Sequence, residues 1–440
     1  MDYIVSFVII FVLMLVGATV TLAGRNEILK HYKTGKPIPY GGTLSSARIK
    51  IPKKIRTRNL KMRGVWVATV GNIDFARHKK ASDFKREYLD VIRNLRKNNF
   101  TAIMYQIRPT NDAFYRSKLN PWSKYLSGKE GQGIKGFDPL DFMLKETHKR
   151  GIEYHAWLNP YRVTHSTNLR KAAYLKTLDP NNFARLHPEF VLEIPRGKGQ
   201  YQLILDPGQP EVRKFIINTI KEIIENYKVD AIHFDDYFYP YVGVGDLDKA
   251  TFESHNPEKM NIDDWRRYNV NTVIKDIKQC IDDCEKKQHR KIHFGISPFG
   301  IWANKKSKPE GSLTKGSQSY FTQFADTRLW IKKGWIDYIV PQIYWSFDHE
   351  VAAYAALVDW WADTVKNTKT DLYIGQAASR LGSIKGWKSP DELYNQMRYN
   401  SKNKNVKGTV FFSYSSLFKP RNNTMKKGSA KVLKVLGRIR

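Results

Sequence analysis

Eight short apolar segments alternate along this chain with eight longer amphipathic segments, and this alternation constrains the fold more than any other feature. The short segments are rich in Val, Ile and aromatic residues and end at Gly, Pro, Asn or polar clusters, as β-strands do. We predict strands at Gly64–Thr69, Thr101–Ile107, Glu153–Leu158, Val229–Asp235, Lys291–Ser297, Asp337–Tyr344, Leu372–Gln376 and Thr409–Ser413.

The longer segments between these strands have the apolar spacing of helices, and several begin with a capping residue, such as Asp138 before Pro139. We predict helices at about Ala81–Asn98, Pro139–Arg150, Pro210–Tyr227, Asp263–Lys287, Tyr320–Lys333, Val351–Lys366, Pro390–Ser401 and Met425–Leu436. Strict alternation predicts a parallel sheet, and the eightfold count favours closure into a (β/α)8 TIM barrel of the α/β class.

An open doubly wound sheet is the alternative fold, but no Gly-rich phosphate loop follows the first predicted strand. Long connections follow the second, third and fifth strands, and the third holds an extra strand candidate, Tyr201–Leu205. Barrel enzymes carry such elaborated βα loops on the face where the active site lies.

The N-terminal part of the chain differs from this pattern. Residues 3–23 carry no charge and are long enough to span a bilayer, so we expect residues 1–23 to form an uncleaved transmembrane anchor (signal-anchor) rather than a cleaved signal peptide. Residues 24–61 lack apolar periodicity, and the stretch from Gly24 to Arg63 contains 12 Lys/Arg against one Glu, so we expect residues 24–61 to form a basic stalk. Residues 62–437 then form the barrel domain.

The net charge of +32 favours a polyanionic partner, such as the anionic polymers of a cell wall, lipid headgroups or nucleic acid. No nucleic-acid-binding motif stands out, so we rank wall or membrane above nucleic acid. The two cysteines, Cys280 and Cys284, are spaced i and i+4 on a predicted helix, where a disulfide would strain the backbone, so free thiols are expected. We expect no metal and no cofactor.

The fourth predicted strand runs from Asp230 into two adjacent carboxylates, Asp235 and Asp236, followed by aromatic residues. Buried unpaired Asp is costly in a strand, so this pair indicates chemistry more than stability. Strand alternation puts His233, Asp235 and Tyr237 on one face, and Asp236 joins them only if the pleat breaks at the strand end. His233 is expected to be a packed, hydrogen-bonded barrel residue.

Polar and aromatic residues recur at five strand ends, which a closed barrel would bring to one rim. Amides and Arg bond sugar hydroxyls, while indole and phenol rings stack on sugar faces. The substrate-binding candidates are Gln106, Arg108, Asn111, Asp112, Tyr115, Trp157, Asn159, Tyr161, Arg162, Asp206, Tyr237, Trp302, Gln342, Tyr344 and Trp345.

Two carboxylates in different environments suit glycoside hydrolysis, because one stays ionised while the other, with a raised pKa, protonates the leaving oxygen. We assign the catalytic role to Asp235, with Asp236 beside it. Because side chains of adjacent residues diverge along a strand, the acid could instead be Asp206, Asp112 or Asp348.

Several motifs together resemble one known family: Arg63-Gly64-Val65-Trp66-Val67, Gln106-Ile107-Arg108-Pro109, Trp157-Leu158-Asn159-Pro160-Tyr161-Arg162, His233 to Pro240, and Pro341-Gln342-Ile343-Tyr344-Trp345. In this order, over residues 60–420, they resemble the glycosyl-hydrolase-like family 10 of bacterial envelope proteins. The resemblance implies a (β/α)8 barrel and hydrolysis of peptidoglycan glycan strands stripped of their stem peptides, outside the cytoplasmic membrane.

The fourth strand also resembles, more distantly, the Asp-x-x-Asp-x-Asp-x-Glu strand of family 18 chitinases. Asp230 and Asp235 fit that pattern, but His233 replaces one Asp and Tyr237 stands where the catalytic Glu would be, so that acid is not carried over.

We therefore expect a glycosidase of the cell membrane, single-pass, with its catalytic domain on the cell-wall side and glycan strands as its partner. The positive charges after residue 23 conflict with this topology, although long domains are translocated regardless of nearby charge. Two rival interpretations are a non-catalytic glycan-binding protein of the envelope and a cytoplasm-facing basic protein that binds nucleic acid or anionic lipid.

Overall fold

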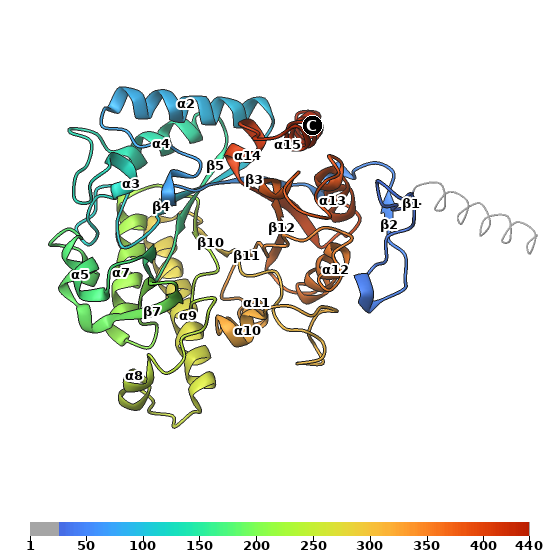
Figure 1. Ribbon diagram of the computed structural model, residues 1–440. Coiled ribbons are helices and arrows are strands. Elements are labelled where there is room, and N and C mark those ends of the chain that lie inside the picture. Colours follow the sequence, from blue (N-terminus) through green and yellow to red (C-terminus); the bar gives the residue numbers. More distant parts are fainter. Residues whose placement is uncertain (1–25, 440) are drawn as a thin grey trace, which may run out of the picture.

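The structure, a computed structural model, describes residues 26–439 and has a closed barrel of eight parallel strands at its centre (Figure 1). The strands neighbour one another in sequence order around the ring, and the last pairs with the first. They are β3 (Met62–Val67), β4 (Ala102–Arg108), β5 (Glu153–Leu158), β9 (Ala231–Phe234), β10 (His293–Ile296), β11 (Tyr338–Ile339), β12 (Asp371–Ala377) and β13 (Val406–Phe412). This confirms the predicted TIM barrel.

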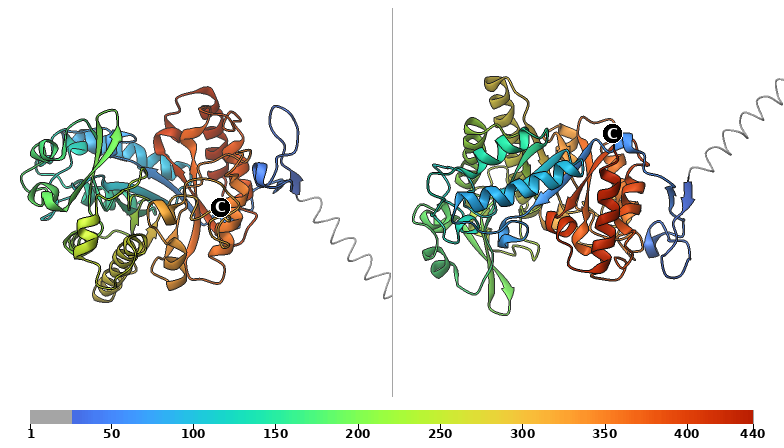
Figure 2. Two further views of the ribbon diagram at one scale, coloured as in Figure 1. Left: turned by 60° about the horizontal axis from the view of Figure 1, so that its bottom comes forward. Right: turned by 90° about the horizontal axis from the view of Figure 1, so that it is seen from above.

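Helices surround the ring on its outside, as the views in Figures 1 and 2 show. The main ones are α2 (Ala81–Lys97), α4 (Pro139–His148), α7 (Pro210–Asn226), α9 (Ile262–Gln288), α11 (Thr327–Lys333), α12 (Tyr354–Thr364), α13 (Glu392–Asn400) and α15 (Asn423–Leu436). Their apolar faces pack on the outer side of the strands. On α2, for example, Tyr88, Ile92 and Leu95 are buried.

The connections at the carboxyl ends of the strands carry additional elements. After β5 the chain forms a three-stranded antiparallel sheet of β6 (Arg162–Thr167), β8 (Gln200–Leu205) and β7 (Val191–Gly197), in that order, which contains the extra strand predicted at Tyr201–Leu205. Short helices complete these connections: α3 (Lys124–Ser127), α5 (Lys171–Lys176), α6 (Phe183–Leu186), α8 (Lys249–Ser254), α10 (Ser319–Thr322) and α14 (Tyr414–Phe418). The loops are therefore elaborated on the face of the barrel where the carboxyl ends of the strands lie.

The predicted basic stalk is instead folded, over its described residues 26–61, against the side of the barrel. Strands β1 (Asn26–Ile28) and β2 (Lys50–Pro52) form a small antiparallel sheet, drawn in blue beside α12 and α13 in Figure 1. The buried apolar side chains of residues 26–61 include Leu29, Ile38, Ile49, Ile51 and Leu60. Burial of these side chains away from water stabilises the docked arrangement, so residues 26–61 are not an open linker.

Polar contacts fix the same segment to the barrel. The Tyr40 hydroxyl donates to Asp359 Oδ2 of α12 at 3.1 Å, and Arg398 Nε of α13 donates to the Pro52 carbonyl at 2.6 Å. Gly42 has a positive φ of 62°, and a Cβ there would lie 2.3 Å from the Glu350 carbonyl oxygen, so only Gly fits this contact.

The expected transmembrane anchor at residues 1–23 lies outside the described residues. Within residues 26–439, the structure contains no helix with the length and apolarity needed to cross a bilayer.

Candidate active site

A cavity of about 190 Å³ opens at the carboxyl ends of the barrel strands. Seven of the eight strands contribute to its lining, directly or through the residues that follow them. Eight of the predicted site residues line it: Gln106, Trp157, Arg162, Asp235, Asp236, Tyr237, Gln342 and Tyr344. The closed ring therefore gathers residues that are far apart in sequence, from Trp66 to Phe412.

Asp235 lies at the bottom of this site, where it is 4% exposed and surrounded by hydrogen-bond donors. Trp157 Nε1 donates to its Oδ2 at 3.1 Å, and Asn159 Nδ2 lies 3.0 Å from both carboxylate oxygens. The Tyr237 backbone amide donates to Oδ1 at 3.3 Å, and Arg162 Nη2 lies 4.0 Å from Oδ2. Burial raises the pKa of Asp235, while Arg162 and these donors oppose the rise by favouring the ionised form.

The orientation of Asn159 is itself fixed. Its Oδ1 accepts a hydrogen bond from the Arg162 backbone amide at 2.8 Å, which leaves its Nδ2 facing Asp235. The Arg162 guanidinium stacks on the Tyr237 ring, with 4.0 Å to the ring centroid. The side chains around Asp235 are therefore fixed by their own contacts, and this restricts the position of its carboxylate.

Asp236 faces the same cavity but has a different environment. It is 6% exposed, and the Tyr241 hydroxyl donates to its Oδ2. Burial, followed by the negative charge of Asp235, raises the pKa of Asp236 to about 7. Two neighbouring buried carboxyls hold one proton more readily than none, and Asp235 has the larger number of donors, so these environments favour the proton on Asp236.

Both carboxylates reach the cavity because the strand stops before them. β9 ends at Phe234, so the alternation that would direct Asp235 and Asp236 to opposite faces does not extend to them. The expectation that these two side chains diverge does not hold.

The three other candidate acids lie outside the cavity lining. Asp206 accepts from Thr251 Oγ1 at 2.6 Å and from the Gly208 amide at 2.9 Å, and burial raises its pKa to about 6. Asp112 accepts from the Thr110 amide at 3.1 Å, and Asp348 accepts from Ser346 Oγ at 2.6 Å. Each is used in local loop structure, so Asp236 is the second carboxylate of the site.

Several predicted substrate-binding residues support the site or lie away from it, because their side chains turn into the packing between loops. Arg108 is fully buried and donates to the Asn159 carbonyl at 2.6 Å and to Asn111 Oδ1 at 2.8 Å. It therefore fixes the loop that carries Asn159. The predicted residues that do not line the cavity are Arg108, Asn111, Asp112, Tyr115, Asn159, Tyr161, Asp206, Trp302 and Trp345.

Seven residues that line the cavity were not predicted as site residues: Trp66, Ala68, Val70, Ile73, Tyr241, Ser297 and Phe412. Most are apolar and form a wall of the cavity. Tyr241 could have been found, because it continues the aromatic row after Asp236. Trp66 lies within a strand, where an indole is ordinarily read as core.

The Trp66 indole is held by a row of buried polar side chains inside the barrel. Trp66 Nε1 lies 3.1 Å from His233 Nε2, and His233 Nδ1 lies 3.1 Å from the Tyr338 hydroxyl. The same hydroxyl lies 2.7 Å from His155 Nδ1, and His155 Nε2 lies 3.1 Å from Glu153 Oε2. Burial holds the pKa of His233 well below its usual range, so His233 is a neutral packed residue, as predicted.

Proton positions along this row follow from its two ends. Trp66 can only donate, so His233 accepts at Nε2 and donates from Nδ1 to Tyr338. Tyr338 then donates to His155, which donates to the Glu153 carboxylate. A Cβ on Gly295 would lie 1.9 Å from Tyr338 Cζ, so the glycine makes room for the tyrosine ring. Among the described residues, no group of three or more His, Cys, Asp or Glu is placed to hold a metal ion.

Comparison with known proteins agrees with this geometry. The family profile described as Glycosyl hydrolase-like 10 matches residues 61–390, which include both carboxylates. The chain belongs to this family.

Its relatives carry matching names. The chain is 44% identical over 367 residues to "Glycosyl hydrolase YngK" of Bacillus subtilis (strain 168), covering 81% of this chain and 69% of the relative. It is 35% identical over 393 residues to "Glycosyl hydrolase DigH" of Escherichia coli (strain K12), covering 84% and 87%. These relationships confirm the resemblance and identify the chain as a glycoside hydrolase.

Among solved structures, the PgaB (BpsB) glycoside hydrolase domain from Bordetella bronchiseptica aligns with a TM-score of 0.53 at 13% identity. The alignment covers 86% of this chain and 98% of that domain. At this identity the likeness supports the barrel fold alone.

Proposed function

We propose that this member of the family hydrolyses peptidoglycan glycan strands that lack stem peptides, with Asp236 as general acid and Asp235 as the ionised carboxylate. The observation that carries the proposal is the pair of buried carboxylates with unlike partners on one cavity. Protonated Asp236 donates its proton to the glycosidic oxygen as the bond from that oxygen to the anomeric carbon breaks. Ionised Asp235 stabilises the positive charge that develops at the anomeric carbon, or attacks it.

Water completes the reaction at the anomeric carbon, and its proton returns to the carboxylate that gave one up. Arg162, Trp157 and Asn159 keep Asp235 ionised, because each donates to or attracts its negative charge. A raised pKa keeps Asp236 protonated near neutral pH. The two roles thus follow from different environments rather than from different residue types.

The cavity walls support an N-acetylated sugar as the bound ring. The lining combines polar side chains, among them Gln106, Arg162 and Gln342, with apolar ones such as Trp66 and Phe412. Polar side chains bond hydroxyl and acetamido groups, while apolar ones accept the ring face and the acetamido methyl group. The family resemblance favours wall glycan over other N-acetylated polymers.

We also propose that the protein works on the wall side of the cell membrane, with residues 1–23 as its anchor. The uncharged run at residues 3–23 supports this placement. Accessibility of the barrel to an added protease in intact cells, after wall removal, tests it, and protection of the barrel would overturn it.

The proposal predicts that Asp235→Asn stops cleavage while the protein stays folded. Incubation of the chain from residue 26 onward with stem-peptide-free glycan, followed by mass analysis of the products, measures this. We expect a rate loss on the order of a thousandfold or more, because both the charge and its position are required.

Asp348→Asn is the matched control, since this carboxylate, whose side chain is 21% exposed, lies outside the cavity. It should retain the normal rate. Full turnover by Asp235→Asn would exclude Asp235 from the mechanism, and glycan binding without any turnover by the unaltered chain would favour a binding protein instead.

A further inference from the structure

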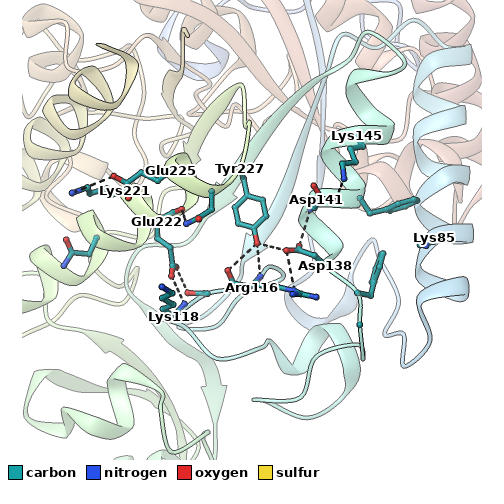
Figure 3. Close-up of a pocket in the computed structure, with 16 residues that line it drawn as sticks. Lys85, Arg116, Lys118, Asp138, Asp141, Lys145, Lys221, Glu222, Glu225 and Tyr227 are labelled. Carbon is teal, nitrogen blue, oxygen red and sulfur yellow. Dashed lines mark hydrogen bonds and ion pairs between the residues drawn. The ribbon is translucent and has the colours of Figure 1, made fainter. Parts of the chain in front are cut away.

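Two of the open grooves on the outside of the barrel are similar in size but differ in how their charges are paired. Figure 3 shows the first, of about 1120 Å³, next to α4 and α7. Three of its five cations have acidic partners: Lys145 lies 2.7 Å from Asp141, Lys221 lies 3.9 Å from Glu225, and Arg116 lies 4.0 Å from Asp138. Four carboxylates face the five cations, so this groove is nearly balanced in charge and carries no inference about a ligand.

The second groove, of about 900 Å³, lies beside α11 and the end of α12. We call it the basic groove, because five cationic side chains line it: Lys308, Arg328, Lys332, Lys333 and Lys369. Over residues 26–439, none of these five makes an ion pair within 4.0 Å. A concave surface with unpaired like charges is repulsive by itself and attracts an anion.

The two acidic residues of the basic groove do not neutralise it. Asp326 accepts from the Leu329 amide at 3.3 Å and from Trp302 Nε1 at 3.2 Å, so it caps α11 and fixes the indole. Burial raises the pKa of Asp326, and the nearby charges of Arg328 and Lys308 oppose the rise. Glu310 is exposed at the rim of the groove.

Helix stability explains only part of this charge. Lys332 and Lys333 lie in the last turn of α11, where cations complement the helix dipole. Lys308 and Arg328 have no such role. They lie over aromatic rings, at 4.6 Å from the Tyr320 centroid and 4.8 Å from the Trp302 centroid, which orders them before any ligand arrives.

We propose that the basic groove binds a linear polyanion that carries phosphate charges along a flexible chain without bases. A trough beside a helix admits a single chain but not the flat surface of a membrane. Trp302 is 4% exposed and covered by Arg328, so no open ring is offered for stacking a nucleic acid base. Four of the five cations are lysines, compact charges that suit phosphate oxygens.

The basic groove shares no lining residue with the cavity of Asp235 and Asp236. It is therefore a second site, which would hold the enzyme on an anionic polymer while the barrel mouth remains open to glycan. Trp302, predicted as a sugar-stacking residue, lies at the base of this groove instead.

The test is binding of labelled linear inorganic polyphosphate to the full chain across a salt series. The variant Lys332→Glu/Lys333→Glu/Lys369→Glu should bind on the order of tenfold more weakly, with a shallower salt dependence, because fewer counterions are released. Cleavage of glycan by this variant should be unchanged, which also shows that it is folded.

The matched control reverses three lysines of the groove in Figure 3: Lys85→Glu/Lys118→Glu/Lys145→Glu. It changes the net charge equally and should leave polyphosphate affinity nearly unchanged. Equal loss in both variants would overturn the proposal, because affinity would then follow net charge. Tighter groove-dependent binding of single-stranded DNA or of anionic vesicles would overturn the choice of a phosphate chain without bases.

Discussion

Two carboxylates line the small cavity at the barrel mouth and four line the large groove of Figure 3, but the two sets differ in burial and in ion pairing. In the groove, Asp141 and Glu225 are exposed and face lysines on the same helix. In the cavity, Asp235 and Asp236 are buried beside one another with one cation nearby. The comparison teaches that volume is a poor guide to chemistry, whereas burial of charge without full compensation marks the reactive place.

The largest effect is expected when Asp236, the carboxyl whose pKa is raised to about 7, is neutralised. Asp236→Asn should slow cleavage of natural glycan by roughly two to four orders of magnitude, because the leaving oxygen no longer receives a proton. A substrate with an aryl leaving group needs little protonation and should lose far less. Rates on both substrates measure the difference, and an equal loss on both would exclude the acid role.

The pH dependence of the cleavage rate tests the same assignment of roles to Asp235 and Asp236. Asp236 must be protonated to act, so activity should fall as the pH rises through its pKa of about 7. Asp235 must be ionised, so activity should also fall on the acid side. Because the folded pKa of Asp236 exceeds its ordinary value of 3.8, its contribution to stability is full below that value and is lost as the pH rises through about 7.

A smaller effect is expected from Tyr241→Phe, which removes the hydroxyl that donates to Asp236. This hydrogen bond favours the ionised form, so its loss should raise the pKa of Asp236 and move the alkaline limb upward by about one pH unit. Tyr237→Phe is the control, because the aromatic stack on Arg162 remains. A limb that stays in place would show that Tyr241 does not influence the acid.

The smallest effect is expected in the groove of Figure 3. Glu222 accepts from the Lys118 amide at 2.6 Å and from the Ser117 hydroxyl, so it organises the loop after β4. Glu222→Gln should lower the free energy of unfolding by about 1–2 kcal/mol, measured with denaturant, and leave glycan cleavage unchanged. Loss of cleavage with normal stability would mean that this groove belongs to the reaction.

The fold was predictable where local pattern and long-range packing agree. Glu153–Leu158 is a strand as predicted, and the barrel closes as the eightfold count requires. The strand predicted at Asp337–Tyr344 is only two residues long, because Pro341 has no amide hydrogen for the ladder. The helix predicted at Tyr320–Lys333 is broken at Phe324, which has a φ of 53°, and begins again after Asp326 caps α11.

The docking of residues 26–61 was not predictable, because their apolar residues follow no helical or strand period. These residues contact helices α12 and α13, which are distant in sequence. The site was predictable to the level of strand ends, since parallel strands must meet at one rim. Which side chains turn inward there was not, because it depends on where each strand stops. Asp236 enters the cavity after β9 ends, while Tyr115 and Tyr161 turn into the packing.

The buried row of hydrogen-bonded side chains from Trp66 to Glu153 has a consequence for where protons can move near the cavity. An indole nitrogen neither releases its hydrogen in water nor takes up a second one, so no proton can travel up the barrel axis through Trp66. Ser297 Oγ, which lines the cavity, also lies 3.1 Å from His233 Nε2, so the row reaches the cavity through a hydroxyl as well as through the indole. Because a hydroxyl can both donate and accept, Ser297 is the point at which the buried row and the open mouth meet.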